Sequence, residues 1–149
     1  MTEVLRRDDG SAPLEFITAG LILLVPLVYL VIAMANIQGA SLAAAGAARQ
    51  AARVYVTAPN AAAAGERMRR AVTVALTDYG VDATTASITV RCSPKPSVCL
   101  TRSGSVTVTI GARAGLPLMP SALDLDSAAS VAVRAVATQT VSRFWVGQE

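Results

Sequence analysis

The most informative part of the chain begins with the stretch Gly10-Ser11-Ala12-Pro13-Leu14-Glu15-Phe16. From Phe16 to Ile37 there follow 22 uncharged residues, most of them leucine, isoleucine, valine or alanine. As an α-helix, this run would extend about 33 Å, which is enough to cross the hydrocarbon core of a bilayer. The sequence therefore predicts a membrane-spanning helix close to the N-terminus.

Glu15 is the only charged residue between Asp9 and Arg49. An ionised acid in a membrane helix costs about 2.5 to 3.5 kcal/mol at the bilayer centre and less near the interface. Two interpretations follow. Glu15 marks the headgroup boundary at the start of the helix, or its carboxylate is held by a positively charged partner.

The spacing around Gly10 bears on this choice. Cleavage after Gly10 would make Ser11 the first residue and Glu15 the fifth, and would place a new α-amine one helical turn from the carboxylate. A short charged leader ending in glycine, followed by this glutamate and an apolar helix, resembles the N-terminus of type IV prepilins. The small size and alanine-rich continuation resemble actinobacterial TadE-like minor pilins of tight-adherence (Tad/Flp) pili. The motif covers about residues 6–55, and beyond them the resemblance is one of architecture only.

The resemblance implies a function for each part of the N-terminus. Residues 1–10 would be the leader, removed between Gly10 and Ser11 by a prepilin peptidase, and Glu15 and Phe16 would take part in assembly. Partners would be other pilin subunits, which contact the N-terminal helix, and the pilus assembly platform. The chain would cross the cytoplasmic membrane once with its C-terminal part outside, and would reach a surface pilus after assembly. A minor role is inferred from size, because abundant Flp pilins are much shorter.

Two other interpretations of the N-terminus stay open. The chain could be a single-pass, membrane-anchored extracytoplasmic binding domain that never polymerises and keeps Gly10 uncut. Alternatively, Ala33-Met34-Ala35 resembles a signal-peptidase site, so the segment could be a secretory signal that releases a soluble domain. The mature protein would begin at Ser11 for the pilin, at Met1 for the anchored domain and at Asn36 for the secreted one.

Composition argues against catalysis. The 149 residues include no histidine, which removes Ser/His and Cys/His nucleophile pairs and most zinc sites. The sequence has no glycine-rich phosphate loop, and Asp124 with Asp126 is typical of a solvated turn. The 13 basic residues, which give a net charge of +3, are scattered singly instead of gathering as a nucleic-acid-binding patch. We therefore expect no enzyme activity, no cofactor or metal and no nucleic-acid partner.

The remaining residues predict a small α+β head. Residues 11–56 form the long helix, and residues 57–149 form a head with one helix and a three-stranded antiparallel sheet. Asn60 is a suitable cap for the head helix, which would run to Tyr79 and stop at Gly80. Alternation of apolar and polar residues predicts the strands, which are Ser87 to Cys92, Ser105 to Gly111 and about Ser130 to Thr140.

Cys92 and Cys99 enclose six residues, a spacing too wide for a CxxC redox motif. A disulfide is the expected use if this part lies outside the cytoplasm, where oxidation is permitted. The alternative is a pair of reduced, partly buried cysteines.

Two further features raise packing questions. Gly39, Ala43, Ala47 and Ala51 form a ladder of small residues at four-residue spacing, which allows two helices to approach closely. Either this face packs on a neighbouring subunit, or it reflects the abundance of alanine. Near the C-terminus, Phe144 and Trp145 are predicted to cover the sheet edge and tie down the tail.

Overall fold

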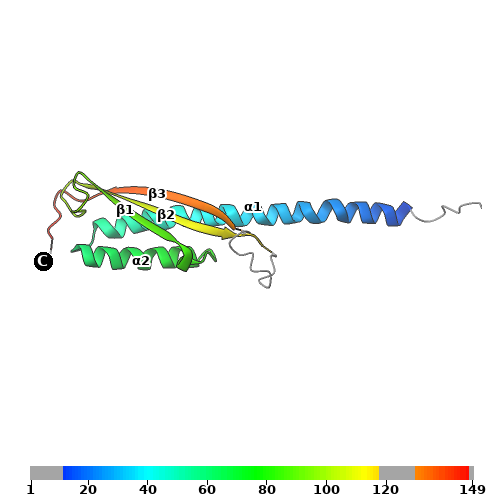
Figure 1. Cartoon of the computed structure of the whole chain (residues 1–149), viewed down its shortest axis with the longest axis horizontal. Coiled ribbons are helices and arrows are strands. Elements are labelled where there is room, and N and C mark those ends of the chain that lie inside the picture. Colours follow the sequence, from blue (N-terminus) through cyan, green and yellow to red (C-terminus); the bar gives the residue numbers. More distant parts are fainter. Residues whose placement is uncertain (1–11, 118–129, 148–149) are drawn as a thin grey trace, which may run out of the picture.

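The structure, a computed structural model, describes residues 12–117 and 130–147. Its elements in chain order are α1 (Ala12–Val56), α2 (Ala61–Thr77), the short 3-10 helix η1 (Ala83–Thr85), β1 (Ser87–Ser93), β2 (Ser105–Gly115) and β3 (Ser130–Thr140). A long N-terminal helix, a second helix and a three-stranded antiparallel sheet confirm the predicted α+β class (Figure 1). Gly10, Ser11, Asp124 and Asp126 lie outside the described residues.

Helix α1 has two halves with different surroundings. It runs for 45 residues, which corresponds to about 68 Å of helix. The assigned helix continues through Pro26, whose ring removes one backbone donor. The N-terminal half projects away from every other element, whereas the C-terminal half lies beside α2 and the sheet (Figure 1). The second half of α1 is therefore part of the head.

The sheet has the strand order β1-β2-β3, and both pairings are antiparallel. Alternate residues of β2 point into the core and are buried; they are Val106, Val108, Ile110, Ala112 and Ala114. The outer face carries threonines, and the hydroxyls of Thr107 and Thr138 are 2.8 Å apart across β2 and β3. Strand β2 extends four residues beyond its predicted end at Gly111, because Gly115 still pairs with Ser130 of β3.

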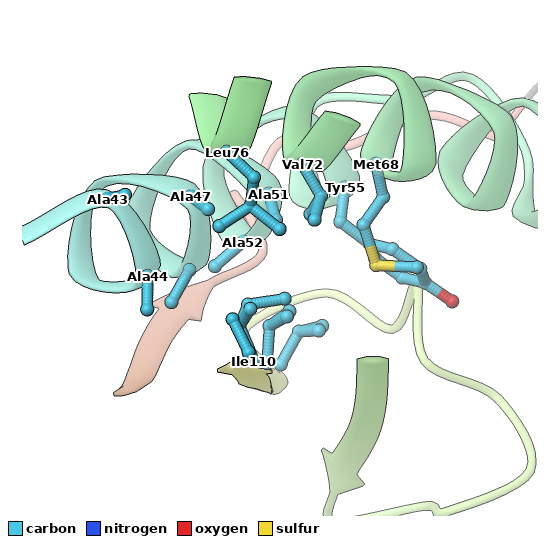
Figure 2. Packing of buried hydrophobic residues seen from close by; sticks show 14 of the residues in the cluster. Ala43, Ala44, Ala47, Ala51, Ala52, Tyr55, Met68, Val72, Leu76 and Ile110 are labelled. Atoms are coloured by element: carbon cyan, nitrogen blue, oxygen red, sulfur yellow. The ribbon is translucent and has the colours of Figure 1, made fainter. Parts of the chain in front are cut away.

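The core is built on the alanines of α1 (Figure 2). Ala44, Ala47, Ala48, Ala51 and Ala52 have no exposed surface. Such small side chains let the helix approach α2 and the sheet closely, and larger side chains from those elements fill the space between. Those larger residues include Met68, Val72 and Leu76 of α2 and Ile110 of β2.

Local signals set the limits of α2. The Asn60 side chain accepts a hydrogen bond from the Ala63 amide at 2.9 Å, as predicted for the N-cap. Gly80 follows the helix with φ +67°, a conformation that glycine adopts without strain. The helix was predicted to run to Tyr79 but ends two residues earlier, at Thr77, and Tyr79 is 58% exposed.

The C-terminal residues are tied to the head by Trp145. Its indole Nε1 donates to the carbonyl oxygen of Ala58 at 2.9 Å, and its own carbonyl accepts from Arg102 Nε at 2.9 Å. The tryptophan therefore joins the α1–α2 linker to the β1–β2 loop, and this is how it ties down the tail. Phe144 is 74% exposed, so only one of the two aromatic residues has the predicted tethering role.

Candidate functional site: the projecting half of α1

The projecting half of α1 consists of residues 12–36. Every leucine, isoleucine, valine and phenylalanine side chain from Leu14 to Ile32 is between 41% and 80% exposed. Of residues 12–36, only Ala33 is buried. These 25 residues correspond to about 37 Å of helix, somewhat more than the hydrocarbon thickness of a bilayer. Helix α1 is therefore long and apolar enough to span a membrane.

This amount of exposed apolar surface distinguishes the segment from the core helix of a soluble protein. A core helix buries its apolar side chains against the rest of the chain, whereas here the apolar residues surround the helix on all sides. Exposing this surface to water would cost about 25 cal/mol of free energy for each Å² of apolar area. Lipid or the apolar helices of neighbouring subunits would remove this cost.

Glu15 lies in the first turn of α1 and is exposed. A carboxylate there is favoured by the partial positive charge at the start of a helix. Within the described part of the chain, no hydrogen bond or ion pair involves its side chain. Phe16 beside it is 80% exposed. The two predicted assembly residues are therefore next to each other at the tip of the projecting half, and the predicted cleavage residues, Gly10 and Ser11, precede them outside the described range.

The head is too far away to neutralise Glu15. The first residue of α1 in the head's core cluster is Ala40. The 25 residues that separate it from Glu15 span about 37 Å along the helix axis. A cationic partner for Glu15 must therefore come from the chain's own N-terminus or from another molecule.

The ladder of small residues is used within the chain. Ala43, Ala47 and Ala51 are at most 1% exposed, and Gly39 is half-buried. The three alanines pack against α2 and the sheet of the same molecule, so they are not available to a neighbouring subunit (Figure 2). Of the two interpretations of the ladder, packing of its alanines on a neighbouring subunit does not fit this structure, and the surface left for another helix is the projecting half.

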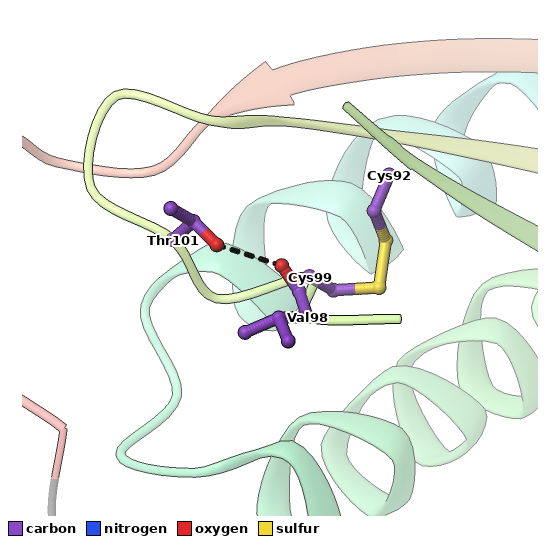
Figure 3. Close-up of a disulfide and its surroundings, with 4 residues drawn as sticks. All are labelled: Cys92, Val98, Cys99 and Thr101. Carbon is purple, nitrogen blue, oxygen red and sulfur yellow. Dashed lines mark hydrogen bonds between the residues drawn. A yellow bond between two sulfur atoms is a disulfide. The ribbon is translucent and has the colours of Figure 1, made fainter. Parts of the chain in front are cut away.

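Cys92 and Cys99 form a disulfide with their Cα atoms 5.0 Å apart (Figure 3). The bond joins the end of β1 to the loop that leads to β2. Inside that loop the Thr101 hydroxyl donates to the carbonyl oxygen of Val98 at 2.7 Å. The β1–β2 loop lies at the end of the head farthest from the projecting half of α1 (Figure 1). The disulfide therefore belongs to the distal end of the molecule.

Electrostatic features of the head are modest. Burial raises the pKa of Tyr55 above its ordinary value of 10.0, so this phenol stays neutral. Hydrogen bonds from the Thr84 hydroxyl and amide lower the pKa of Asp82, whose carboxylate caps η1. The ion pair in the described ranges, Glu66 with Arg70, is highly exposed on both sides and contributes little to stability.

The described residues show no arrangement typical of catalysis. No group of three His, Cys, Asp or Glu side chains in residues 12–117 and 130–147 is placed to hold a metal ion. The absence of enzyme activity, cofactors and nucleic-acid partners stays a prediction. The strongest candidate for a functional site is thus a surface, the apolar projecting half of α1 with Glu15 near its tip.

Comparisons with family models, with curated proteins and with solved structures give no significant match for this chain.

Proposed function

We propose that this chain is a minor pilin or pseudopilin of a type IV, Tad/Flp-type pilus. The observation that carries the proposal is the projecting half of α1, an apolar rod continuous with a helix that is built into the head. Such a rod can lie in the membrane before assembly and among other helices afterwards, because both surroundings exclude water. Cleavage after Gly10 would prepare the subunit for this transfer.

Glu15 has a specific role in this proposal. Among packed helices its carboxylate would be buried and would need a cationic partner. Cleavage creates an α-amine on Ser11, one helical turn from Glu15 in the same chain, and an adjacent subunit carries the same amine. Pairing of this carboxylate with the α-amine of an adjacent subunit would fix the axial register of one helix relative to the next. Because the head lies about 37 Å away, no head residue can replace that amine.

The disulfide supports a head outside the cytoplasm. Structural disulfides persist in oxidising compartments and are rare in the reducing cytoplasm. Cys92 and Cys99 lie in the head, on the far side from the apolar half of α1. An N-terminus in the cytoplasm and a head outside it are consistent with both the disulfide and the apolar half of α1. This orientation also leaves the leader on the cytoplasmic side, where a prepilin peptidase would be expected to act.

The length of the projecting half also favours a second candidate function. About 37 Å of apolar helix matches one bilayer crossing without any need for a polymer. The chain could therefore be a single-pass, membrane-anchored binding domain. In that case Glu15 would lie at the headgroup boundary, where its charge needs no partner from another subunit.

The substitution Glu15→Gln separates the two candidates, because it keeps the size of the side chain and removes its charge. As a pilin, the variant should still insert and lose its leader, but its incorporation into filaments should fall at least tenfold. The reason is that an amine left unpaired in a dry helix bundle costs about 3 to 5 kcal/mol. The measurement is the ratio of protein in sheared surface filaments to protein in the membrane fraction.

Thr18→Val is a matched control, since this side chain is one turn away and its hydroxyl donates only to the Leu14 carbonyl of its own helix. It should leave the ratio unchanged. If Glu15→Gln also leaves the ratio unchanged, the anchored-domain candidate is favoured and the pilin proposal is contradicted.

A further inference from the structure

Two arginines and two hydroxyl side chains line a groove at the base of the head, on the side from which α1 projects. The groove has a volume of about 450 Å³, and its lining includes Thr85, Ser87, Gly111, Arg113 and Arg134. We call it the basal groove. No local sequence pattern marks this groove, because its residues come from η1 and all three strands and meet only through the sheet register.

The register brings the groove residues together. Ser87 of β1 and Arg134 of β3 both lie opposite Gly111 of β2. The glycine matters because a side chain at position 111 would approach the Ser87 hydroxyl oxygen to 2.5 Å. The absence of a side chain in the middle strand therefore lets the Ser87 hydroxyl lie over Gly111, toward the strand that carries Arg134.

Arg113 provides the second guanidinium. Its Nη1 atom donates to the Ser130 hydroxyl at 3.4 Å, and a guanidinium has five donors in total, so it can make several contacts at once. Its side chain is exposed, as is that of Arg134. Guanidinium and hydroxyl donors together are well suited to bind a phosphate oxygen.

A second cavity relates the groove to the membrane. Arg113 also lines a cavity of about 330 Å³ together with Asn36 of α1 and Tyr79. If the hydrocarbon core begins just after Glu15, its thickness of about 30 Å is used up after about 20 residues, close to Ala35. Asn36 would then lie at the boundary with the headgroup layer, which is about 5 to 7 Å thick on each side. Arg113, which lines the same cavity as Asn36, would be close to that layer.

From this geometry we propose that the basal groove binds the phosphate of an anionic lipid headgroup while the chain is in the membrane. This inference rests on the membrane insertion of α1, and it adds that the inserted chain prefers anionic lipids. Arg134 lies opposite position 111, two residues before Arg113, which places the two arginines within about 7 Å of each other along the strand direction. Tyr79, 58% exposed at the same end, fits the enrichment of tyrosine at membrane interfaces.

Carboxylates at the base of the head limit how the lipid can approach. Asp78 and Asp82 lie beyond the end of α2 and before η1, and neither lines the basal groove. Asp82 accepts hydrogen bonds from the Thr84 amide and hydroxyl at 2.8 and 2.7 Å, and its lowered pKa keeps it charged. These two acids repel anionic headgroups and therefore disfavour an approach of the lipid from the α2 side.

The test uses the full chain in bilayer nanodiscs of phosphatidylcholine, with and without phosphatidylglycerol. Hydrogen exchange of segments 111–115 and 130–134 should slow in the anionic bilayers, and high salt should abolish the difference. Each arginine near an anionic surface is expected to favour association about fivefold. Arg134→Gln should therefore remove most of the added protection.

Arg91→Gln is the matched control. Arg91 is exposed on the same strand face as Ser87, four residues along β1, which is about 13 Å farther from the base. The substitution Arg91→Gln removes the same charge as Arg134→Gln, but the added protection of the two segments in anionic bilayers should remain. Equal loss in both variants would mean a general charge effect and would overturn the assignment of the groove.

Two further arms identify the ligand and separate this inference from the proposed function. Inorganic phosphate added to phosphatidylcholine nanodiscs should not protect the segments; if it does so equally well, the ligand is a free oxyanion and not a lipid. Flotation with vesicles of both compositions tests insertion itself. A chain that floats with both but shows no protection refutes the lipid site alone, whereas a chain that floats with neither refutes both proposals.

Discussion

Single alanines determine which surface of α1 is free. Ala44, Ala47 and Ala51 have no exposed surface, since α2 and the sheet of the same chain cover them. From the sequence alone, a ladder of small residues is compatible with packing inside a molecule or between molecules, because close approach of two backbones needs the same side chains in both cases. The partner depends on contacts that are distant in the sequence.

Ala47→Leu tests this packing. The added atoms have no space at a position with no exposed surface, so the head should lose about 1 to 3 kcal/mol of unfolding free energy. Chemical unfolding of the full chain in detergent, followed by tryptophan fluorescence, gives the measurement. Ala62→Leu, at an exposed position of α2, should change stability by no more than about 0.5 kcal/mol.

An Ala47→Leu chain as stable as the unmodified one would show that this face is not packed in the head. The ladder would then be available to a neighbouring subunit after all.

Helices and strands were predicted best where local chemistry sets their ends. The Asn60 cap and the positive φ of Gly80 depend only on neighbouring backbone atoms, so the limits of α2 were found to within a few residues. The end of β2 was missed because Gly115 is held by Ser130 of β3, and such pairing leaves little local pattern. The Trp145 contact with Ala58 joins residues 87 positions apart and could not be predicted from either neighbourhood.

The β1–β2 loop depends on the disulfide for its closure. On the chain-entropy account, linking Cys92 and Cys99 across a loop of eight residues stabilises the fold by about 2.5 kcal/mol. Replacing both cysteines by serine should therefore lower the unfolding free energy of the head by about that amount. Far-ultraviolet circular dichroism should show that most of the helical content in detergent is kept, because the loop is remote from the projecting half of α1.

Mass analysis of the protein from the cell surface, without a reducing agent, provides the chemical check. Cys92 and Cys99 should be found in one linked peptide with no free thiol. Two thiols that react with an alkylating agent before reduction would contradict the disulfide and would remove the support it gives to a head outside the cytoplasm.

Considered as one molecule, the chain has two ends with different chemistry. An apolar rod with a carboxylate near its tip extends from one end, and a disulfide-linked loop lies at the other (Figure 1). The sequence indicated both ends, because a long apolar run and two cysteines are visible without long-range contacts. The sequence could not show that the two halves of α1 have different surroundings. One half is exposed, and the other half packs against α2 and the sheet in the core of the head.

The first residue of the mature protein is the most direct test of the proposed function. It should be determined by N-terminal sequencing of the protein recovered from the membrane and from sheared filaments. The pilin proposal predicts Ser11 in both fractions, and Gly10→Leu should leave the full-length chain in the membrane. Mature protein that begins at Met1 would favour an anchored domain, one that begins at Asn36 a secreted domain, and either result would contradict the proposal.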